Sequence, residues 1–493
     1  MRRLRSDNSS SSLTVQLALP PPTSKRGYNI CYPAVYWLND DILLGIFNCY
    51  RLVEKNDWND QLEWCKLSHV CQKWRHLIYE CSSHLGMHIK CTNGSPMVNT
   101  LDHLPMLPLF VQYHYSHHSA PTVPEQDELG IYHTLRLHGR IRHLELALPP
   151  SILHKALALM DGTFSILEYL SLSCLFSADS GHCLPLTLPK AFLAQNLQHL
   201  ALTGIGLPKR LRVLTSTASL VKLTLSMIQT SSYFRPRLLV ARLRSLPLLE
   251  QLFIGFSIPI PRPSTERELL GEQGAPITLP SLKILDFHGV GAYLEYLVAQ
   301  IRVPLLEKLY IRLFNQIALL LPHLFYLINT TKVFKHSSAT VSFHHDQVFV
   351  STTVHDHDFE RISFLLSVMC EPLDWQIDCA AQICRALIPT LSCVEILSLY
   401  HANDVIPTEM RNGAIDSVMW HDFFRMFIGV KILNIDDALL EELSHALQVD
   451  EVGSDPGFLP NVQSIRARHN LFTSFIDTRQ VVGRPVQFEE FLW

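Results

Sequence analysis

A short apolar pattern recurs along most of the chain and constrains its fold more than any other feature. Seven early copies read IRHLEL at 141, LEYLSL at 167, LQHLAL at 197, LVKLTL at 220, LEQLFI at 249, LKILDF at 282 and LEKLYI at 306. Three later ones read VEILSL at 394, VKILNI at 430 and VQSIRA at 462. Apolar residues at alternate positions predict a half-buried strand, and successive starts 23 to 33 residues apart among the first seven predict one supersecondary unit per copy.

Helix-like segments lie between these strands, beginning for example at Ser151, Ala292 and Cys379. A strand followed by a returning helix, many times over, predicts a parallel sheet with right-handed connections. Proline stands two residues before several of the strand patterns and separates helix from strand, because it cannot continue a helix. These prolines are Pro247, Pro280, Pro304 and Pro460. The stretch between Phe314 and Leu391 fits the pattern worst, and the alternation from Val341 around a His-His-Asp-Gln turn indicates a hairpin or a distorted repeat.

The length and composition agree with an elongated stack of such units. A single core stops growing near ~250–300 residues, which a chain of 493 residues exceeds, whereas a solenoid grows by stacking. Hydrophobic residues make up 47% and charged residues 17%, and the net charge is −4, which offers no basic surface for nucleic acid or an anionic membrane. The densest apolar run, 317–328, is shorter than the ~20 residues of a membrane span and is interrupted by Pro322 and His323. We therefore expect no nucleic-acid and no membrane partner.

The N-terminal segment and the cysteines of the chain indicate a reducing compartment. Residues 1–29 are expected to be a disordered leader, because the arginines and serines there are not followed by the long apolar run of a signal peptide. Twelve cysteines are scattered without a dense framework and are expected to be free thiols. The predicted location is the cytoplasm, the nucleus or both.

Two amphipathic helical segments are predicted near the N-terminus. In YWLNDDILLGIF, Asn39 can cap a helix whose first turn carries two aspartates, and apolar residues follow at i, i+3 and i+4 spacing. In WCKLSHVCQKWRHLIY, from Trp64, another apolar stripe includes Val70, Cys71 and Trp74. Helices this short cannot bury much area alone, so a module of this size without a metal motif favours a partner.

These residues resemble the F-box, in which Leu-Pro-x-Glu-Ile/Leu-Leu-x-x-Ile-Phe precedes a second half with a Val-Cys/Ser-Arg/Lys-x-Trp core. Asn39 stands where proline is usual, and Asp41 where glutamate is usual. With the repeats, the chain resembles F-box proteins with irregular leucine-rich repeats, of the fungal type. The resemblance implies docking of a Skp-type adaptor, and through it a cullin–RING ligase. The implied adaptor-binding residues are Leu38, Asn39, Ile42, Leu43, Ile46, Phe47, Val70, Cys71 and Trp74.

The expected fold is an α/β solenoid with a small N-terminal helical F-box module followed by an irregular leucine-rich-repeat horseshoe. The predicted segments are a leader (1–29), the F-box module (30–90), a linker or capping segment (91–135), the solenoid (136–480) and a C-terminal tail (481–493). The resemblance implies a non-catalytic substrate-recognition subunit of a Skp–cullin–F-box ubiquitin ligase. The alternative is a stand-alone leucine-rich-repeat scaffold or ligand sensor, whose N-terminal helices only cap the repeats.

The side chains between the buried positions of each strand are expected to face the concave surface of the solenoid. In the early strands they are small or polar: Glu145, Ser171, Ser173, Ala201, Thr203, Thr224 and Ser226. In the later strands aromatic and charged residues, the types that anchor protein interfaces, predict where an unknown protein substrate binds, although solvated strand residues would have the same pattern. The predicted substrate-binding residues are Phe253, Asp286, His288, Tyr310, Arg312, Tyr400, Asp436, Arg466 and Arg468, with Asn434 in the same alternation.

The sequence carries no motif that predicts catalysis, a cofactor or a metal. It has no phosphate-binding glycine loop, no Gly-x-Ser-x-Gly elbow, no paired CxxC and no HExxH. The histidines at 114, 117 and 118 lack a second ligand pair and are expected to lie on the surface. The run His-Asp-His-Asp at 355–358 is expected to be a solvated loop, since neighbouring residues of a strand would face opposite ways. An enzyme with a repeat appendage is therefore the least favoured class.

Overall fold

The computed structural model describes most of the chain from residue 38 onward. The described residues are 38–53, 63–81, 88–94, 101, 106–115, 123–175, 186–208, 212–229, 232–257, 275–314, 319–356, 359–370, 373–401, 417–447 and 458–490. The predicted leader (1–29) lies outside them. The chain divides into two compact units, Met1–Leu85 and Gly86–Trp493, which are described separately.

Within its described residues, the first unit contains three helices, α1 (Asp40–Val53), α2 (Glu63–Ser68) and α3 (Gln72–Glu80). The predicted cap is confirmed, because the Ile42 backbone N–H donates to Asn39 Oδ1 at 2.9 Å. Cys71 caps α3, accepting at Sγ from the Trp74 N–H at 3.4 Å. Lys73 joins the start of α1 to α3, since its Nζ donates to the Leu38 carbonyl at 2.9 Å.

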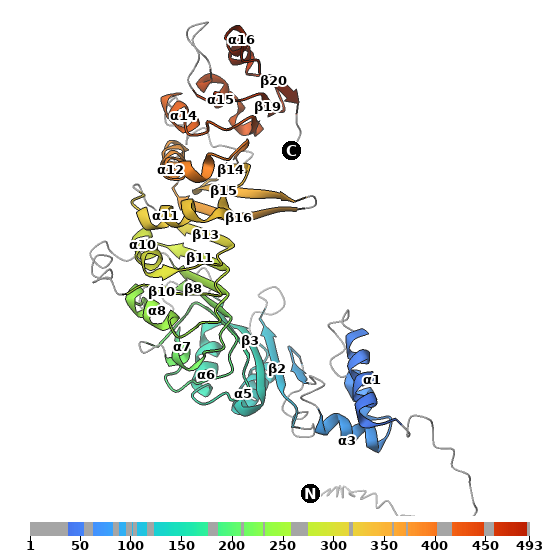
Figure 1. Ribbon diagram of the computed structural model, residues 1–493. Coiled ribbons are helices and arrows are strands. Elements are labelled where there is room, and N and C mark those ends of the chain that lie inside the picture. Colours follow the sequence, from blue (N-terminus) through green and yellow to red (C-terminus); the bar gives the residue numbers. More distant parts are fainter. Residues whose placement is uncertain are drawn as a thin grey trace, which may run out of the picture. The chain divides into compact units, whose positions relative to one another are not determined.

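The second unit is mixed α/β and is built on one open, mostly parallel sheet of sixteen strands among the described residues (Figure 1). The strands, in sheet order, are β1 (Ile89–Cys91), β2 (Leu109–His114), β3 (Ile141–Leu148), β4 (Tyr169–Cys174), β6 (His199–Thr203), β8 (Lys222–Ile228), β9 (Gln251–Phe256), β11 (Ile284–Gly289), β13 (Lys308–Leu313), β16 (Phe359–Met369), β15 (Gln347–Asp356), β14 (Ser338–Phe343), β17 (Ile396–His401), β18 (Ile432–Ile435), β19 (Ser464–Ala467) and β20 (Gln487–Glu490). Each of the ten apolar patterns contributes a strand, so this prediction is confirmed.

Helices follow most of these strands and lie together on one side of them in Figure 1. They are α5 (Glu125–Arg136), α6 (Pro150–Leu159), α7 (Arg212–Ser216), α8 (Pro236–Leu243), α10 (Gly291–Gln300), α11 (Pro322–Thr330), α12 (Leu373–Ala386), α13 (Ile388–Leu391), α14 (Ser417–Phe424), α15 (Leu440–Ala446) and α16 (Thr473–Val481). Three of them cover the segments predicted from Ser151, Ala292 and Cys379. Two small parallel pairs, β5 (Leu186–Thr187) with β7 (Ile205–Gly206) and β10 (Ile277–Thr278) with β12 (Ile301–Arg302), complete the unit.

The apolar positions of the strands form the core, as the alternation predicts. In β13, Leu309, Ile311 and Leu313 are buried, whereas the residues between them are half-exposed. The same alternation runs through β4, β6 and β11. Buried residues lie opposite buried residues of the next strand, as Leu309 does opposite Leu285 and Leu170 opposite Leu200, so one apolar layer continues from strand to strand.

The region between 314 and 391 contains the one antiparallel part of the described sheet. β14 and β15 form the predicted hairpin, with Val341 opposite Val350 and the turn closed by the His344 N–H donating to the Gln347 carbonyl at 2.9 Å. β15 also pairs antiparallel with β16, and β16 in turn lies parallel to β13. His355 and Asp356 belong to β15, so the loop predicted at 355–358 is wrong for these two residues, and residues 357 and 358 lie outside the described part.

The sheet extends further at both ends than expected. The segment 91–135, predicted to be a linker or capping segment, carries β2 and α5, and the predicted tail (481–493) carries β20 paired with β19. The signals were weak because LFVQYH and QFEE do not follow the leucine pattern of the other strands.

Candidate partner-binding surfaces

The helical unit has an apolar core of its own. Leu43 and Phe47 on α1 are 0% and 1% exposed, and Leu77 and Ile78 on α3 are also buried. The Phe47 ring meets Trp74 edge-on, with 4.8 Å between the ring centroids and 68° between the planes. These residues therefore hold the helices together. The prediction that Leu43 and Phe47 contact an adaptor directly is not supported by their burial.

The other predicted apolar residues of this unit remain exposed. Ile42 and Ile46, one turn apart on α1, are 50% and 43% exposed, and Val70 before α3 is 57% exposed. Leu38, Asn39 and Cys71 act at the helix ends, two of them as caps. We refer to Ile42, Ile46 and Val70 as the exposed apolar residues of the helical unit.

Five of the predicted substrate-binding residues form one continuous area on the sheet, which we call the β9–β13 patch: Phe253, Asp286, His288, Tyr310 and Arg312. Asp286 lies between Phe253 and Tyr310 in the strand register, and His288 lies opposite Arg312. His288 Nε2 is 3.2 Å from Asp286 Oδ1, and its ring meets Phe253 edge-on at 4.9 Å. Burial and the Asp286 carboxylate raise the pKa of Tyr310, which keeps its phenol protonated.

A hollow of about 270 Å³ lies next to this patch, and we call it the β14–β17 hollow. It opens among strands β14 to β17, and Tyr400 is the predicted residue that lines it. Its lining is Thr340, Ser342, His344, Phe349, Ser351, Thr353, Ile362, Leu365 and Tyr400. The Tyr310 hydroxyl donates to the Ile362 carbonyl at 3.1 Å, and Leu365 lies opposite Tyr310, so the patch and the hollow adjoin.

The remaining predicted residues are engaged within the chain. Asp436 accepts at Oδ1 from the Ala438 N–H at 3.3 Å and at Oδ2 from the His401 N–H at 3.2 Å. Arg466 Nε donates to Glu489 Oε2 at 2.6 Å, and Arg468 Nη1 donates to Asp437 Oδ2 at 3.0 Å.

Asn434 was expected on the exposed face but is buried. Its Nδ2 donates to Ser398 Oγ at 2.9 Å. The later strands therefore carry a patch, a hollow and a set of internal polar contacts, and not one continuous substrate site.

The sequence reasoning missed a row of rings on the early strands. His88, Phe110, His143, Tyr169 and His199 follow one another from β1 to β6, and we call them the ring row. Ring centroids are 3.7 Å apart between His88 and Phe110 and 4.1 Å apart between His143 and Tyr169. The signal was available, because the third position of the first three patterns is aromatic or histidine and shares a face with the fifth.

Burial governs the chemistry of the ring row. Desolvation lowers the pKa of His143, against an opposing effect of the neighbouring Glu145, and lowers that of His199 as well. His143 Nε2 is 3.7 Å from Glu145 Oε2, to which Gln112 Nε2 also donates at 3.1 Å. Both histidines are thus held neutral at pH 7, and the row offers ring edges and hydrogen-bonding atoms more than charge.

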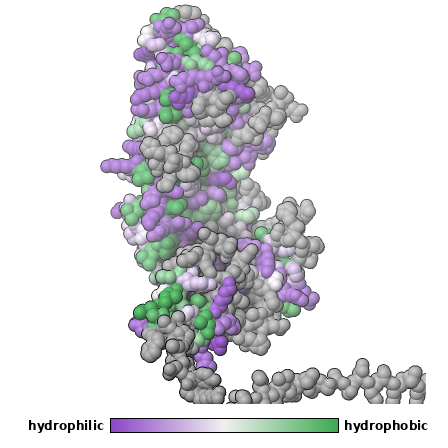
Figure 2. Space-filling view, turned by 90° about the vertical axis from the view of Figure 1, so that its right-hand side faces the viewer, coloured by the Kyte–Doolittle hydropathy of each residue, from purple (hydrophilic) through white to green (hydrophobic). Residues whose placement is uncertain are grey.

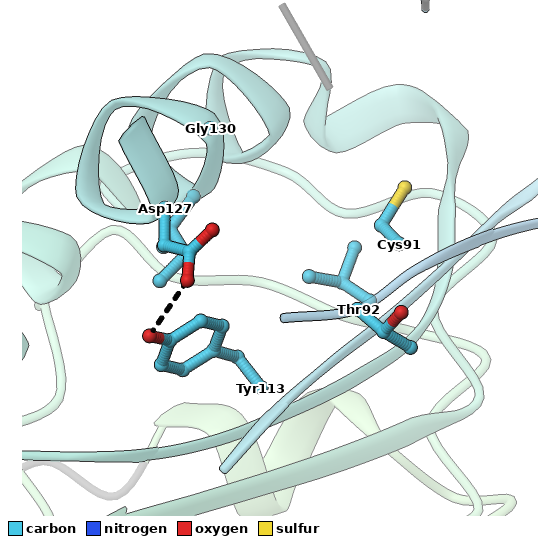
Figure 3. A pocket seen from close by; sticks show the side chains of 7 residues that line it. Cys91, Thr92, Tyr113, Asp127 and Gly130 are labelled. Carbon is cyan, nitrogen blue, oxygen red and sulfur yellow. Dashed lines mark hydrogen bonds between the residues drawn. The ribbon is translucent and has the colours of Figure 1, made fainter. Parts of the chain in front are cut away.

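A smaller cavity of about 10 Å³ between β1, β2 and α5 has a structural role (Figure 3). The Tyr113 hydroxyl donates to Asp127 Oδ2 at 3.1 Å, and the Gly94 N–H donates to Asp127 Oδ1 at 3.0 Å. Burial and Asp127 raise the pKa of Tyr113, and burial raises that of Cys91 to about 12. The cavity has room for at most about one water molecule, so these contacts tie α5 to the first strands.

Figure 2 shows the side of the molecule toward which β15 and β16 project in Figure 1. Hydrophilic residues gather toward the C-terminal end of this view, and hydrophobic areas are interspersed among hydrophilic ones elsewhere.

Within the described residues, no cluster of three or more His, Cys, Asp or Glu side chains has an arrangement that could hold a metal ion. None of the described helices has the length and apolar character needed to cross a membrane.

No family model matches the sequence, and a comparison with curated proteins found no match.

Proposed function

We propose that the chain is a non-catalytic substrate-recognition subunit of a Skp–cullin–F-box ubiquitin ligase. In this proposal the helical unit docks a Skp-type adaptor, and the second unit is a leucine-rich-repeat solenoid with an irregular horseshoe form that holds a protein substrate. Such a subunit works in the cytoplasm or the nucleus. The resemblance of residues 38–78 to the F-box is the starting point.

The main support for the proposal is that the apolar residues of the helical unit fall into a buried set and an exposed set. Leu43 and Phe47 are buried and the Phe47 ring packs against Trp74, so the unit already has a core. Ile42 and Ile46 nevertheless stay exposed one turn apart. Residues at i and i+4 form a single apolar stripe on a helix. An exposed stripe on a small unit is the kind of surface that binds a partner protein.

The sheet supports the second half of the proposal. Neighbouring patterns occupy neighbouring parallel strands in order from β3 to β13, with helices between them, which is the arrangement expected of stacked strand–helix repeats. The β9–β13 patch then supplies an aromatic and charged area for a substrate.

The experiment measures binding of a purified Skp-type adaptor to the immobilised full-length chain. The test variant Ile42→Asp/Ile46→Asp places two charges on the exposed stripe, and we expect at least a tenfold weaker affinity, equivalent to about 1.4 kcal/mol. The matched control is Asn48→Asp, which adds a carboxylate at another exposed position of the same helix and should bind like the wild type. Leu43→Asp is avoided, because a charge in the core would unfold the unit.

The outcomes separate the two functions considered for this chain. Adaptor binding by the wild type and by Asn48→Asp, lost in the double variant, supports the ligase subunit. Equal adaptor binding by the wild type and both variants would mean that the exposed stripe is not the docking surface. If the wild-type chain does not bind the adaptor, the ligase proposal is refuted, and a stand-alone repeat scaffold or ligand sensor takes its place.

A further inference from the structure

Among the described residues, no side chain that lines the β14–β17 hollow is formally charged. Four hydroxyl residues, Thr340, Ser342, Ser351 and Thr353, face it from the two strands of the hairpin, and Ile362 and Leu365 face it from β16. Phe349 contributes a ring that meets His344 edge-on at 4.7 Å. Desolvation lowers the pKa of His344, so this imidazole is also neutral at pH 7.

Thr353 is the residue of this lining that points most directly to a ligand. Its side chain is only 3% exposed, and its Oγ1 has no hydrogen-bond partner among the described residues. The other buried threonine beside it, Thr352, donates to the Phe334 carbonyl at 3.2 Å. A buried hydroxyl without a partner is costly and uncommon in folded proteins, so a group that enters the hollow can satisfy it.

The backbone explains why this hydroxyl lies there. The pairing of β15 with β16 shifts between Thr352 and Thr353, where Phe364 lies opposite the former and Ile362 opposite the latter. Ser363 is thus left out of the register, and its Oγ is 2.7 Å from His336 Nε2. Such a bulge redirects side chains locally and is frequent beside binding sites.

The size and lining of the hollow limit what it can hold. An enclosed cavity of about 150 Å³ accepts benzene, whereas sites for drug-sized ligands begin near about 300 Å³. A volume of about 270 Å³ therefore suits one substituted ring. Phe349, Ile362 and Leu365 offer apolar contacts to such a ring, and the lack of a cationic side chain among the lining residues disfavours phosphate or carboxylate groups.

We propose that the β14–β17 hollow binds an uncharged single-ring group that carries a hydrogen-bond acceptor, to which the Thr353 hydroxyl donates. The ring packs against Phe349 and Leu365, and Tyr400 borders it from β17. The group belongs to a free small molecule or to an aromatic side chain of a protein partner, and both have the same chemistry at this site. The proposal is independent of adaptor docking by the helical unit.

The test uses the full-length chain and ligand-observed NMR by saturation transfer, with p-cresol as the probe. Toluene provides the same ring without the acceptor, and phenyl phosphate provides a ring with negative charge. We expect saturation transfer to p-cresol, weaker transfer to toluene and none above background to phenyl phosphate. A blocked Gly-Tyr-Gly peptide is added in competition. Displacement of p-cresol by the peptide assigns the site to a partner's side chain, and p-cresol binding without displacement assigns it to a free molecule.

Two variants locate the binding. Thr353→Val is nearly isosteric and removes the hydroxyl, so p-cresol should bind three- to tenfold more weakly while toluene is unaffected. Ser342→Phe fills the hollow from a half-exposed position and should abolish binding of both rings. The matched control is Thr224→Val, which removes a hydroxyl from the same face of the sheet but on β8, away from the hollow. It should leave binding unchanged. The proposal is overturned if p-cresol does not bind the wild type, if both variants bind it as the wild type does, or if phenyl phosphate binds equally well.

Discussion

Phe47→Ala should unfold the helical unit and leave the sheet intact. The Phe47 ring is 1% exposed, and truncation of a buried phenylalanine costs about 3–5 kcal/mol. The edge-on contact with Trp74 at 4.8 Å contributes about 0.5–1.5 kcal/mol. Part of this contribution is already included in the cost of truncating the phenylalanine. The described helices of this unit lie within residues 38–81, and below about 70–80 residues one core seldom supplies more than 3–5 kcal/mol of stability, so the loss equals the whole stability.

Hydrogen exchange measured by mass spectrometry on the full chain checks this prediction. Peptides from α1 and α3 should lose their protection in Phe47→Ala, whereas peptides from β9 and β11 should keep it, because they belong to the other unit. Ile46→Ala is the matched control one residue away on the same helix. Its side chain is 43% exposed, so the change in unfolding free energy should stay within about 0.5 kcal/mol. Unchanged protection in Phe47→Ala, or an equal loss in Ile46→Ala, would refute the assignment of core and surface on α1.

Three further predictions concern the second unit and the thiols. Asn434→Ala should lower the unfolding free energy by about 1–3 kcal/mol, measured by urea denaturation, because it removes the buried hydrogen bond to Ser398; a loss below 0.5 kcal/mol would contradict that role. Burial lowers the pKa of His143, so the unfolded chain takes up its proton first as the pH falls. The unfolding free energy should therefore decrease between pH 7 and pH 5, and His143→Phe should flatten that slope, whereas an unchanged slope would refute the burial argument. Iodoacetamide should modify the exposed Cys49 within minutes at pH 8 and leave Cys384 unmodified, because complete burial raises the pKa of the Cys384 thiol; mass spectrometry of the digested chain would show equal labelling if this is wrong.

The strands could be predicted because their burial requirement is visible in each segment separately. A residue such as Leu309 must be apolar, since it lies between the buried residues Leu285 and Phe364 on the two adjacent strands. The Asn39 cap could be predicted for a similar reason, since it depends only on residues within one turn. Requirements that depend only on nearby residues of the chain can therefore be recognised from the sequence.

The exposed face could be predicted less well, because its contacts depend on which strands become neighbours. Asn434 has the alternation of an exposed residue, but Ser398 on the next strand bonds to it, 36 residues away, and both are buried. The stacking of His143 on Tyr169 likewise needs the register between β3 and β4. Ile42 is exposed and Leu43 is buried, although both are apolar and adjacent on α1. This difference could not be predicted from the sequence, because it depends on where the other helices lie.

The β14–β17 hollow illustrates why the most informative site lies where the repeat pattern fails. In a regular parallel stack, each side chain has an equivalent neighbour one strand away, so the exposed face repeats from strand to strand. Three strands, β16, β15 and β14, lie between β13 and β17, and β15 runs antiparallel to both of its neighbours, which breaks that equivalence. The register shift at Thr353 leaves its hydroxyl buried without a hydrogen-bond partner among the described residues. If the hairpin only continued the sheet, the side chains that line the hollow could all be apolar, and β15 could pair with β16 without a register shift. The mixed lining and the unpaired hydroxyl are therefore better explained by a bound group than by the stability of the sheet, and Thr353→Val distinguishes the two: it should raise the unfolding free energy of the chain while weakening p-cresol binding.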